Sequence, residues 1–186
     1  MFVDWLLSYC ISHDVVAEDD IPMLRYCIEK KLYTFVTFIP LVIVGILIAG
    51  VLTTVSFLWT FIYLRQMTNG YHAKTPGRCF LSSILLESLI LACARYDFPF
   101  GAILIMTAAS ALVIWLFSPY PHPNMNYSPT EILVCRVISR KRVIIVFLVM
   151  FLCYALSMPH IVNGICFGAI LASVLLGFAY TTKQRS

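Results

Sequence analysis

The sequence predicts an all-α protein embedded in a membrane, with about four to six transmembrane or re-entrant helices. Hydrophobic residues make up 61% of the 186-residue chain and charged residues only 12%, whereas a soluble domain has about a quarter charged residues. Several uncharged segments approach or exceed the roughly 20 residues that one membrane span requires. A small soluble fold leaves too much surface exposed to bury so many apolar residues. The composition therefore excludes a free globular domain, and also a disordered chain, which needs low hydrophobicity.

The charge and the cysteine content narrow the classes of partner and cofactor. The chain has 13 Lys and Arg against 9 Asp and Glu, a net charge of +4, which in a membrane protein bears on topology rather than on nucleic-acid binding. Its seven cysteines are odd in number and include no Cys-x-x-Cys pair, so they predict neither a disulfide framework nor a zinc site. We expect no metal, no organic cofactor and no nucleic-acid partner.

Residues 1–31 are expected to form an amphipathic region at the membrane interface. Residues 2–13 are apolar but too short to cross a bilayer. In residues 21–33 apolar side chains recur at helical spacing among basic ones, which predicts a helix lying in the interface. The acidic run at residues 18–20 marks its expected start. The region lacks the basic start and apolar run of a cleavable signal peptide.

The first long apolar segment, residues 32–64, carries no charge and is longer than one span needs. As one helix it would extend for about 50 Å. It is therefore either one tilted, overlong helix or a hairpin or re-entrant pair broken near Gly45 and Gly50.

The rest of the chain alternates between polar and apolar segments within what we expect to be one membrane-embedded domain, residues 1–186. Four prolines prevent a helix across the first half of the longest polar loop. A short turn at residues 159–164 divides the last apolar stretch into two spans. The expected order is a polar loop at 65–78, two spans within 79–117 (79–94 and 98–117), a polar loop at 118–142 and two spans within 143–182.

The basic residues favour the hairpin alternative for the first segment. All 13 Lys and Arg except Arg95 fall in four clusters, at residues 25–31, 65–78, 136–142 and 183–185. Cytoplasmic loops carry an excess of positive charge. All four clusters are cytoplasmic only if residues 32–64 enter and leave the membrane by the same side. We therefore expect a multi-pass protein of the cell membrane with the 65–78 loop on the cytoplasmic side.

The 65–78 loop and the start of the next segment contain a candidate nucleophile and base. Cys79 lies at the predicted N-terminus of an apolar helix, where unpaired N–H groups stabilise a thiolate. Lys74 and Arg78 add positive charge, and His72 is a neighbouring group that can accept the thiol proton. The spacing alone also fits a non-catalytic alternative, in which a small membrane-buried cysteine lies near an interfacial histidine.

Two turn-forming dipeptides, Asn69-Gly70 and Pro76-Gly77, would allow the loop to bring His72 to Cys79. The same stretch contains Arg65, the element Gly70-x-His72-Ala73, and Cys79 seven residues after the histidine. This pattern resembles the signature of the accessory gene regulator B family of bacterial membrane cysteine endopeptidases. The later order of span, proline-containing polar loop, basic cluster and two final spans is also similar.

The resemblance implies a specific reaction. Family members remove the C-terminal part of a small propeptide of a quorum-sensing signal, through a thioester on the catalytic cysteine. A central Cys or Ser of the propeptide then attacks the thioester and closes a thiolactone or lactone ring. By position, Cys79 would be the nucleophile and His72 the general base and later the acid. Membrane lipids are further partners, and the resemblance also allows a homodimer.

Four other residues are secondary candidates for supporting the site or binding the substrate: Arg65, Gly70, Lys74 and Glu87. Glu87 follows Cys79 by eight residues on the predicted helix and would orient a partner or bind a basic group. Its alternative role is an ion pair with an arginine such as Arg95. For Arg65 the alternative is anchoring at the membrane interface.

The basic residues 136–142 are expected to set topology and contact lipid, with binding of an acidic propeptide tail as the minor alternative. A competing interpretation of the whole chain is a non-catalytic small membrane transporter or scaffold protein. In that case Cys79 would tolerate replacement, and Glu87 within the membrane would matter more.

Overall fold

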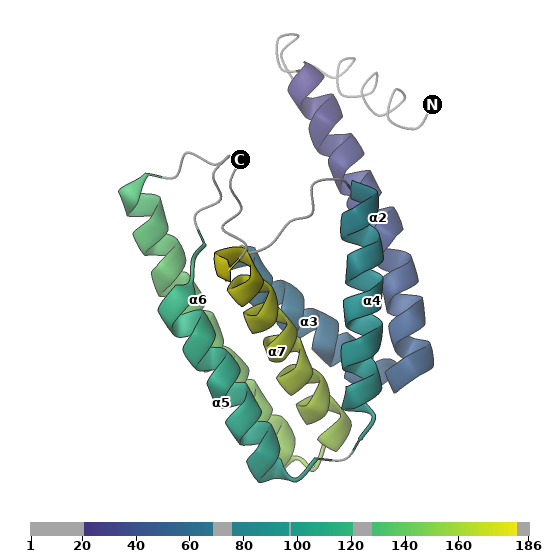
Figure 1. The fold of residues 1–186 in the computed structure, drawn as a ribbon, viewed down its shortest axis with the longest axis vertical. Helices are drawn as coiled ribbons and strands as arrows, with labels where there is room; N and C mark the ends of the chain where they lie inside the picture. Colours follow the sequence, from purple (N-terminus) through teal and green to yellow (C-terminus); the bar gives the residue numbers. More distant parts are fainter. Residues whose placement is uncertain (1–20, 69–75, 97, 121–127, 182–186) are drawn as a thin grey trace. The chain divides into compact units, whose positions relative to one another are not determined.

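The computed structural model describes residues 21–68, 76–96, 98–120 and 128–181. In this part of the chain every regular element is a helix, which confirms the all-α prediction. Two of the helices, α5 and α7, are long and apolar enough to cross a membrane. The elements are α2 (Ile21–Ala49), α3 (Val51–Thr68), α4 (Pro76–Ala94), α5 (Phe100–Phe117), α6 (Pro129–Ala155) and α7 (Pro159–Thr181) (Figure 1).

The chain divides into two compact units, residues 1–41 and residues 42–186. In the first unit the described part is the beginning of α2, which starts at Ile21, directly after the acidic run. The structure does not separate an interfacial helix at 21–33 from the segment that follows. The reason is that residues 23–39 contain neither Gly nor Pro, the residues that most readily end a helix.

The 32–64 segment is divided at Gly50, where α2 ends and α3 begins. Gly50 has a φ of +81°, a left-handed conformation that glycine adopts without steric cost. Within the second unit the chain turns back after Gly50, so that Gly45 of α2 faces α3. A Cβ placed on Gly45 would lie 2.5 Å from Cγ2 of Thr54 and 3.1 Å from Cδ1 of Leu91.

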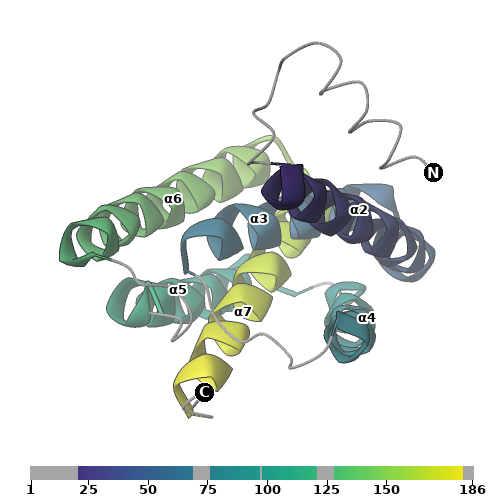
Figure 2. The same ribbon diagram turned by 90° about the horizontal axis from the view of Figure 1, so that it is seen from above.

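In the second unit α7 is the central helix and contacts α3, α4, α5 and α6 (Figure 2). Residues 162–169 of α7 are all buried. The closest approach is between α7 and α3, at Gly164 and Gly168. A Cβ on Gly168 would lie 2.6 Å from the carbonyl oxygen of Phe57, and a Cβ on Gly164 would overlap Thr53 O and Ser56 Oγ. Small residues of this kind let two membrane helices pack backbone to backbone.

The N-terminus of α6 lies within the expected 118–142 loop, at the last of its four prolines. Ser128 caps the helix and forms a capping box with Glu131. Pro129 fits the first helical position because the N–H that it lacks would have no partner there. The backbone N–H of Ser128 donates to Oε2 of Glu131 at 2.8 Å. This bond, together with the bond to the Ser128 side chain, lowers the pKa of Glu131.

Hydrogen bonds between segments far apart in the sequence identify the two ends of the second unit. At one end Asn163 Nδ2, near the start of α7, lies 3.4 Å from the carbonyl oxygens of Ala94 and Tyr96, where α4 finishes. At the other end Tyr120 N donates to Thr68 O at 3.0 Å. We call this second end the loop end, because α3 finishes and α4 begins there, on either side of residues 69–75.

Candidate active site

The candidate nucleophile Cys79 lies in the first turn of α4, which begins at Pro76. A position this close to a helix N-terminus is next to backbone N–H groups without intrahelical partners. The side chain of Cys79 lies outside the described part of the chain, as do residues 69–75, which include Gly70, His72 and Lys74. The pairing of His72 with Cys79 therefore stays a prediction from the sequence.

Pro76 and Gly77 belong to α4, whereas the sequence suggested a turn at this dipeptide. Proline is well suited to the first position of a helix, since its fixed φ is already helical and no N–H is needed there. The connection between α3 and α4 is consequently shorter than the expected 65–78 loop. It joins Thr68, which ends α3, to Pro76.

Arg65 lies in the last turn of α3 and is half-buried. Basic residues are favourable at this position because the carbonyl end of a helix carries partial negative charge. Three residues later Thr68 is fully buried, and its carbonyl oxygen accepts a hydrogen bond from Tyr120. The end of α3 is thus fixed against the segment after α5, which holds one end of the predicted catalytic loop in place.

Glu87 lies on α4 and is only 3% exposed. Its Oε1 atom is buried and has no hydrogen-bond partner among the residues that the structure describes. Arg95, the expected alternative partner, is exposed, so the structure does not support that ion pair. A buried carboxyl group without a partner is costly in a fold and is retained at functional sites more often than elsewhere.

Two further unpartnered polar groups, which the sequence interpretation missed, belong to α3. Thr54 Oγ1 and Thr60 Oγ1 are buried and form no hydrogen bond within the described ranges, whereas Ser56 on the same helix donates to Leu52 O at 2.7 Å. Thr54 and Leu91 both lie close to Gly45, and Leu91 follows Glu87 by one helical turn on the same face of α4. The sequence pattern that could have indicated these groups is the recurrence of Ser and Thr within an otherwise apolar segment.

Replacing Glu87 with Gln should leave the thermal unfolding midpoint unchanged or raise it by the equivalent of about 1 kcal/mol. The reason is that the amide removes an ionisable group from a buried site where, among the described residues, one of its oxygens has no partner. The measurement is thermal unfolding of the detergent-solubilised protein. Glu131→Gln is the matched control and should lower the midpoint, because it weakens a capping box. A larger loss with Glu87→Gln than with Glu131→Gln would reveal a stabilising partner for Glu87.

Comparison with known proteins gives two matches. A family model described as Accessory gene regulator B matches residues 4–176. The Accessory gene regulator protein B of Staphylococcus intermedius is 27% identical over 130 residues, which cover 68% of this chain and 65% of that protein. The chain thus spans less than two thirds of this relative's length. No solved structure matches. Since the family model covers most of the sequence, the chain belongs to the accessory gene regulator B family.

Proposed function

We propose that this protein is a membrane-embedded cysteine endopeptidase that cleaves the propeptide of a quorum-sensing signal and cyclises the product. The observation that carries the proposal is the family match over residues 4–176, together with the signature residues that it includes. The position of Cys79 in the first turn of α4 supports its role as nucleophile. A helix N-terminus lowers the pKa of a thiol by stabilising the thiolate.

In the proposed reaction His72 takes the proton of the Cys79 thiol, and the thiolate attacks the scissile carbonyl carbon. The C–N bond then breaks, and the imidazolium gives its proton to the leaving amine. A thioester joins Cys79 to the N-terminal part of the propeptide. A thiol or hydroxyl from the middle of that part gives its proton to His72 and attacks the thioester, which forms the ring and releases the Cys79 thiolate.

Two further features are part of the proposal. The thioester retains the free energy needed for ring closure, so water must be kept from it. A site at the membrane boundary suits that requirement, and the loop end, where α4 begins, is expected at this boundary. The basic clusters favour a multi-pass topology with this end in the cytoplasm.

The first test is the thiol reactivity of Cys79 between pH 5 and pH 9. We expect Cys79 to react with an alkylating probe well below the ordinary thiol pKa of about 8.5, and to lose this reactivity in His72→Ala. Mass spectrometry of the labelled peptides locates the modified residues. Cys93, which is exposed on the same helix, and the half-buried Cys135 are internal controls. If Cys79 reacts no faster than these two, the transporter or scaffold alternative is favoured instead.

A further inference from the structure

Two of the four basic residues within 136–142 of α6, Arg140 and Arg142, contact neighbouring helices. Arg142 Nη1 donates to the carbonyl oxygen of Tyr63 and to Oε1 of Gln66, the latter at 3.1 Å. The guanidinium carbon of Arg142 also lies 4.6 Å from the centroid of the Tyr63 ring. Arg142 therefore ties α6 to the last turns of α3 at the loop end.

Arg140 is held in a different way. Its guanidinium lies over the Trp115 ring of α5, with 4.9 Å between the guanidinium carbon and the ring centroid. Its Nε atom is buried and has no hydrogen-bond partner in the described part of the chain. The cation is thus oriented by the ring while hydrogen-bond donors remain unused, and a planar guanidinium binds phosphate oxygens in a bidentate manner.

Few carboxylates are available in this unit to neutralise these cations. Residues 42–186 contain three acidic residues: Glu87, Asp97 and Glu131. Glu87 is buried in α4, and Asp97 follows the end of α4 that lies away from the loop end. Glu131 is engaged with the backbone N–H of Ser128. Among the described residues of this unit, no carboxylate is therefore seen to neutralise the positive charge of residues 136–142.

The surface around these cations is apolar. On α6 the exposed apolar residues include Leu133, Val134 and Val137 before Arg140, and Ile144, Ile145 and Leu148 after Arg142. Trp115 and Leu116 of α5 are exposed as well. A water-soluble polyanion would gain nothing from such flanks, whereas a phospholipid would place its acyl chains along them and its headgroup at the cations.

We propose that the loop end of α5 and α6 binds one anionic phospholipid, with the phosphate at Arg140 and the acyl chains along the exposed apolar face of α6. Arg136, which is exposed one turn before Arg140, adds charge at the headgroup. Arg142 holds α6 against α3 and so keeps Arg140 in position. This site is separate from the proposed Cys79 chemistry and does not depend on it.

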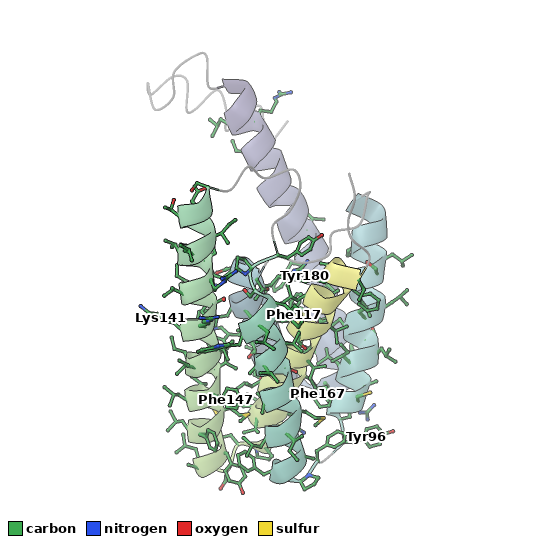
Figure 3. All side chains as sticks on the ribbon, turned by 60° about the vertical axis from the view of Figure 1, so that its left-hand side comes forward. Tyr96, Phe117, Lys141, Phe147, Phe167 and Tyr180 are labelled. Atoms are coloured by element: carbon green, nitrogen blue, oxygen red, sulfur yellow. The ribbon has the colours of Figure 1, made fainter. Side chains whose placement is uncertain are left out.

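Lys141 provides a matched control, because it lies between the two arginines and is exposed. In Figure 3 its side chain points away from the bundle. Arg140→Gln and Lys141→Gln change the net charge equally, so they separate an oriented site from general attraction to a charged bilayer. Arg140→Lys keeps the charge and removes the planar guanidinium.

The experiment is native mass spectrometry of the full-length protein in neutral detergent, titrated with phosphatidylglycerol or phosphatidylcholine. We expect one tightly bound phosphatidylglycerol and no comparable binding of phosphatidylcholine. Arg140→Gln should weaken phosphatidylglycerol binding at least about fivefold, whereas Lys141→Gln should weaken it less than about twofold. Arg140→Lys should fall between the two. The same ranking in thermal stabilisation by phosphatidylglycerol would support the site in folded protein.

Three outcomes would overturn the proposal. Equal losses with Arg140→Gln and Lys141→Gln would mean unspecific charge attraction. Equal binding of both lipids would remove the role of the cations. An acidic peptide or inorganic phosphate that stabilises the protein as well as phosphatidylglycerol does, without acyl chains, would show that the apolar flanks contribute nothing and that the occupant is not a lipid.

Discussion

Replacing Cys79 with Ala should abolish cleavage of the propeptide, with a loss of at least about 10⁴-fold in rate. The reason is that removing a nucleophile removes the covalent pathway and leaves only the binding contributions of the site. His72→Ala should lose about 10²- to 10⁴-fold, as expected for a general base. The measurement is the formation of the C-terminal fragment and of the cyclic product from a synthetic propeptide, by mass spectrometry on full-length protein in liposomes.

Cys135→Ala is the matched control, because it removes a half-buried thiol of α6 that the proposed mechanism does not use. It should cleave at the rate of the unchanged protein. A Cys79→Ala protein that inserts normally and still cleaves the propeptide would contradict the proposed function. A His72→Ala protein with full activity and an unchanged pH profile would leave Cys79 as nucleophile and require another base.

The all-helical fold could be predicted because apolar segments of sufficient length dominate the composition. The exact position of the break within residues 32–64 could not be predicted from the sequence, because Gly45 and Gly50 are both glycines in the same apolar segment. The structure uses Gly50 for its left-handed conformation and Gly45 for a close approach to Thr54. The start of α6 at Pro129 could have been predicted from the capping box of Ser128 and Glu131. The prediction of a loop rested instead on the four prolines of residues 118–142.

The candidate site could be located along the chain but not assembled in space from the sequence. Spacing placed Cys79 at the start of a helix, and α4 indeed begins at Pro76. The burial of Glu87 could not be predicted from the sequence, because it depends on packing against helices far away in sequence. The same holds for Arg142, whose partners Tyr63 and Gln66 precede it by 79 and 76 residues. Contacts over such separations follow from the packing of α6 on α3 and have no local signature.

The contact between α3 and α7 should be the part of the fold most sensitive to a single added methyl group. Gly168→Ala would bring a Cβ to 2.6 Å from Phe57 O and 3.0 Å from Thr60 Cβ. Gly164→Ala would bring one against the backbone carbonyl oxygen of Thr53. Backbone atoms of a packed helix cannot move aside as a side-chain end can, so the helices must separate. We expect each variant to lose about 1–3 kcal/mol, measured by thermal unfolding in detergent.

Gly177→Ala is the matched control on the same helix, because a Cβ there would meet nothing within 4 Å. This variant should be neutral or slightly stabilising, since alanine favours a helix over glycine by about 1 kcal/mol. The pair of outcomes separates steric exclusion from helix propensity, which acts in the same favourable direction at all three positions. If Gly164→Ala and Gly168→Ala unfold at the same temperature as Gly177→Ala, then α3 and α7 do not pack backbone to backbone. If Gly164→Ala and Gly168→Ala lose both stability and propeptide cleavage and Gly177→Ala loses neither, then the packing of α3 on α7 is required to hold the loop end. Cys79 lies at this end, in the first turn of α4.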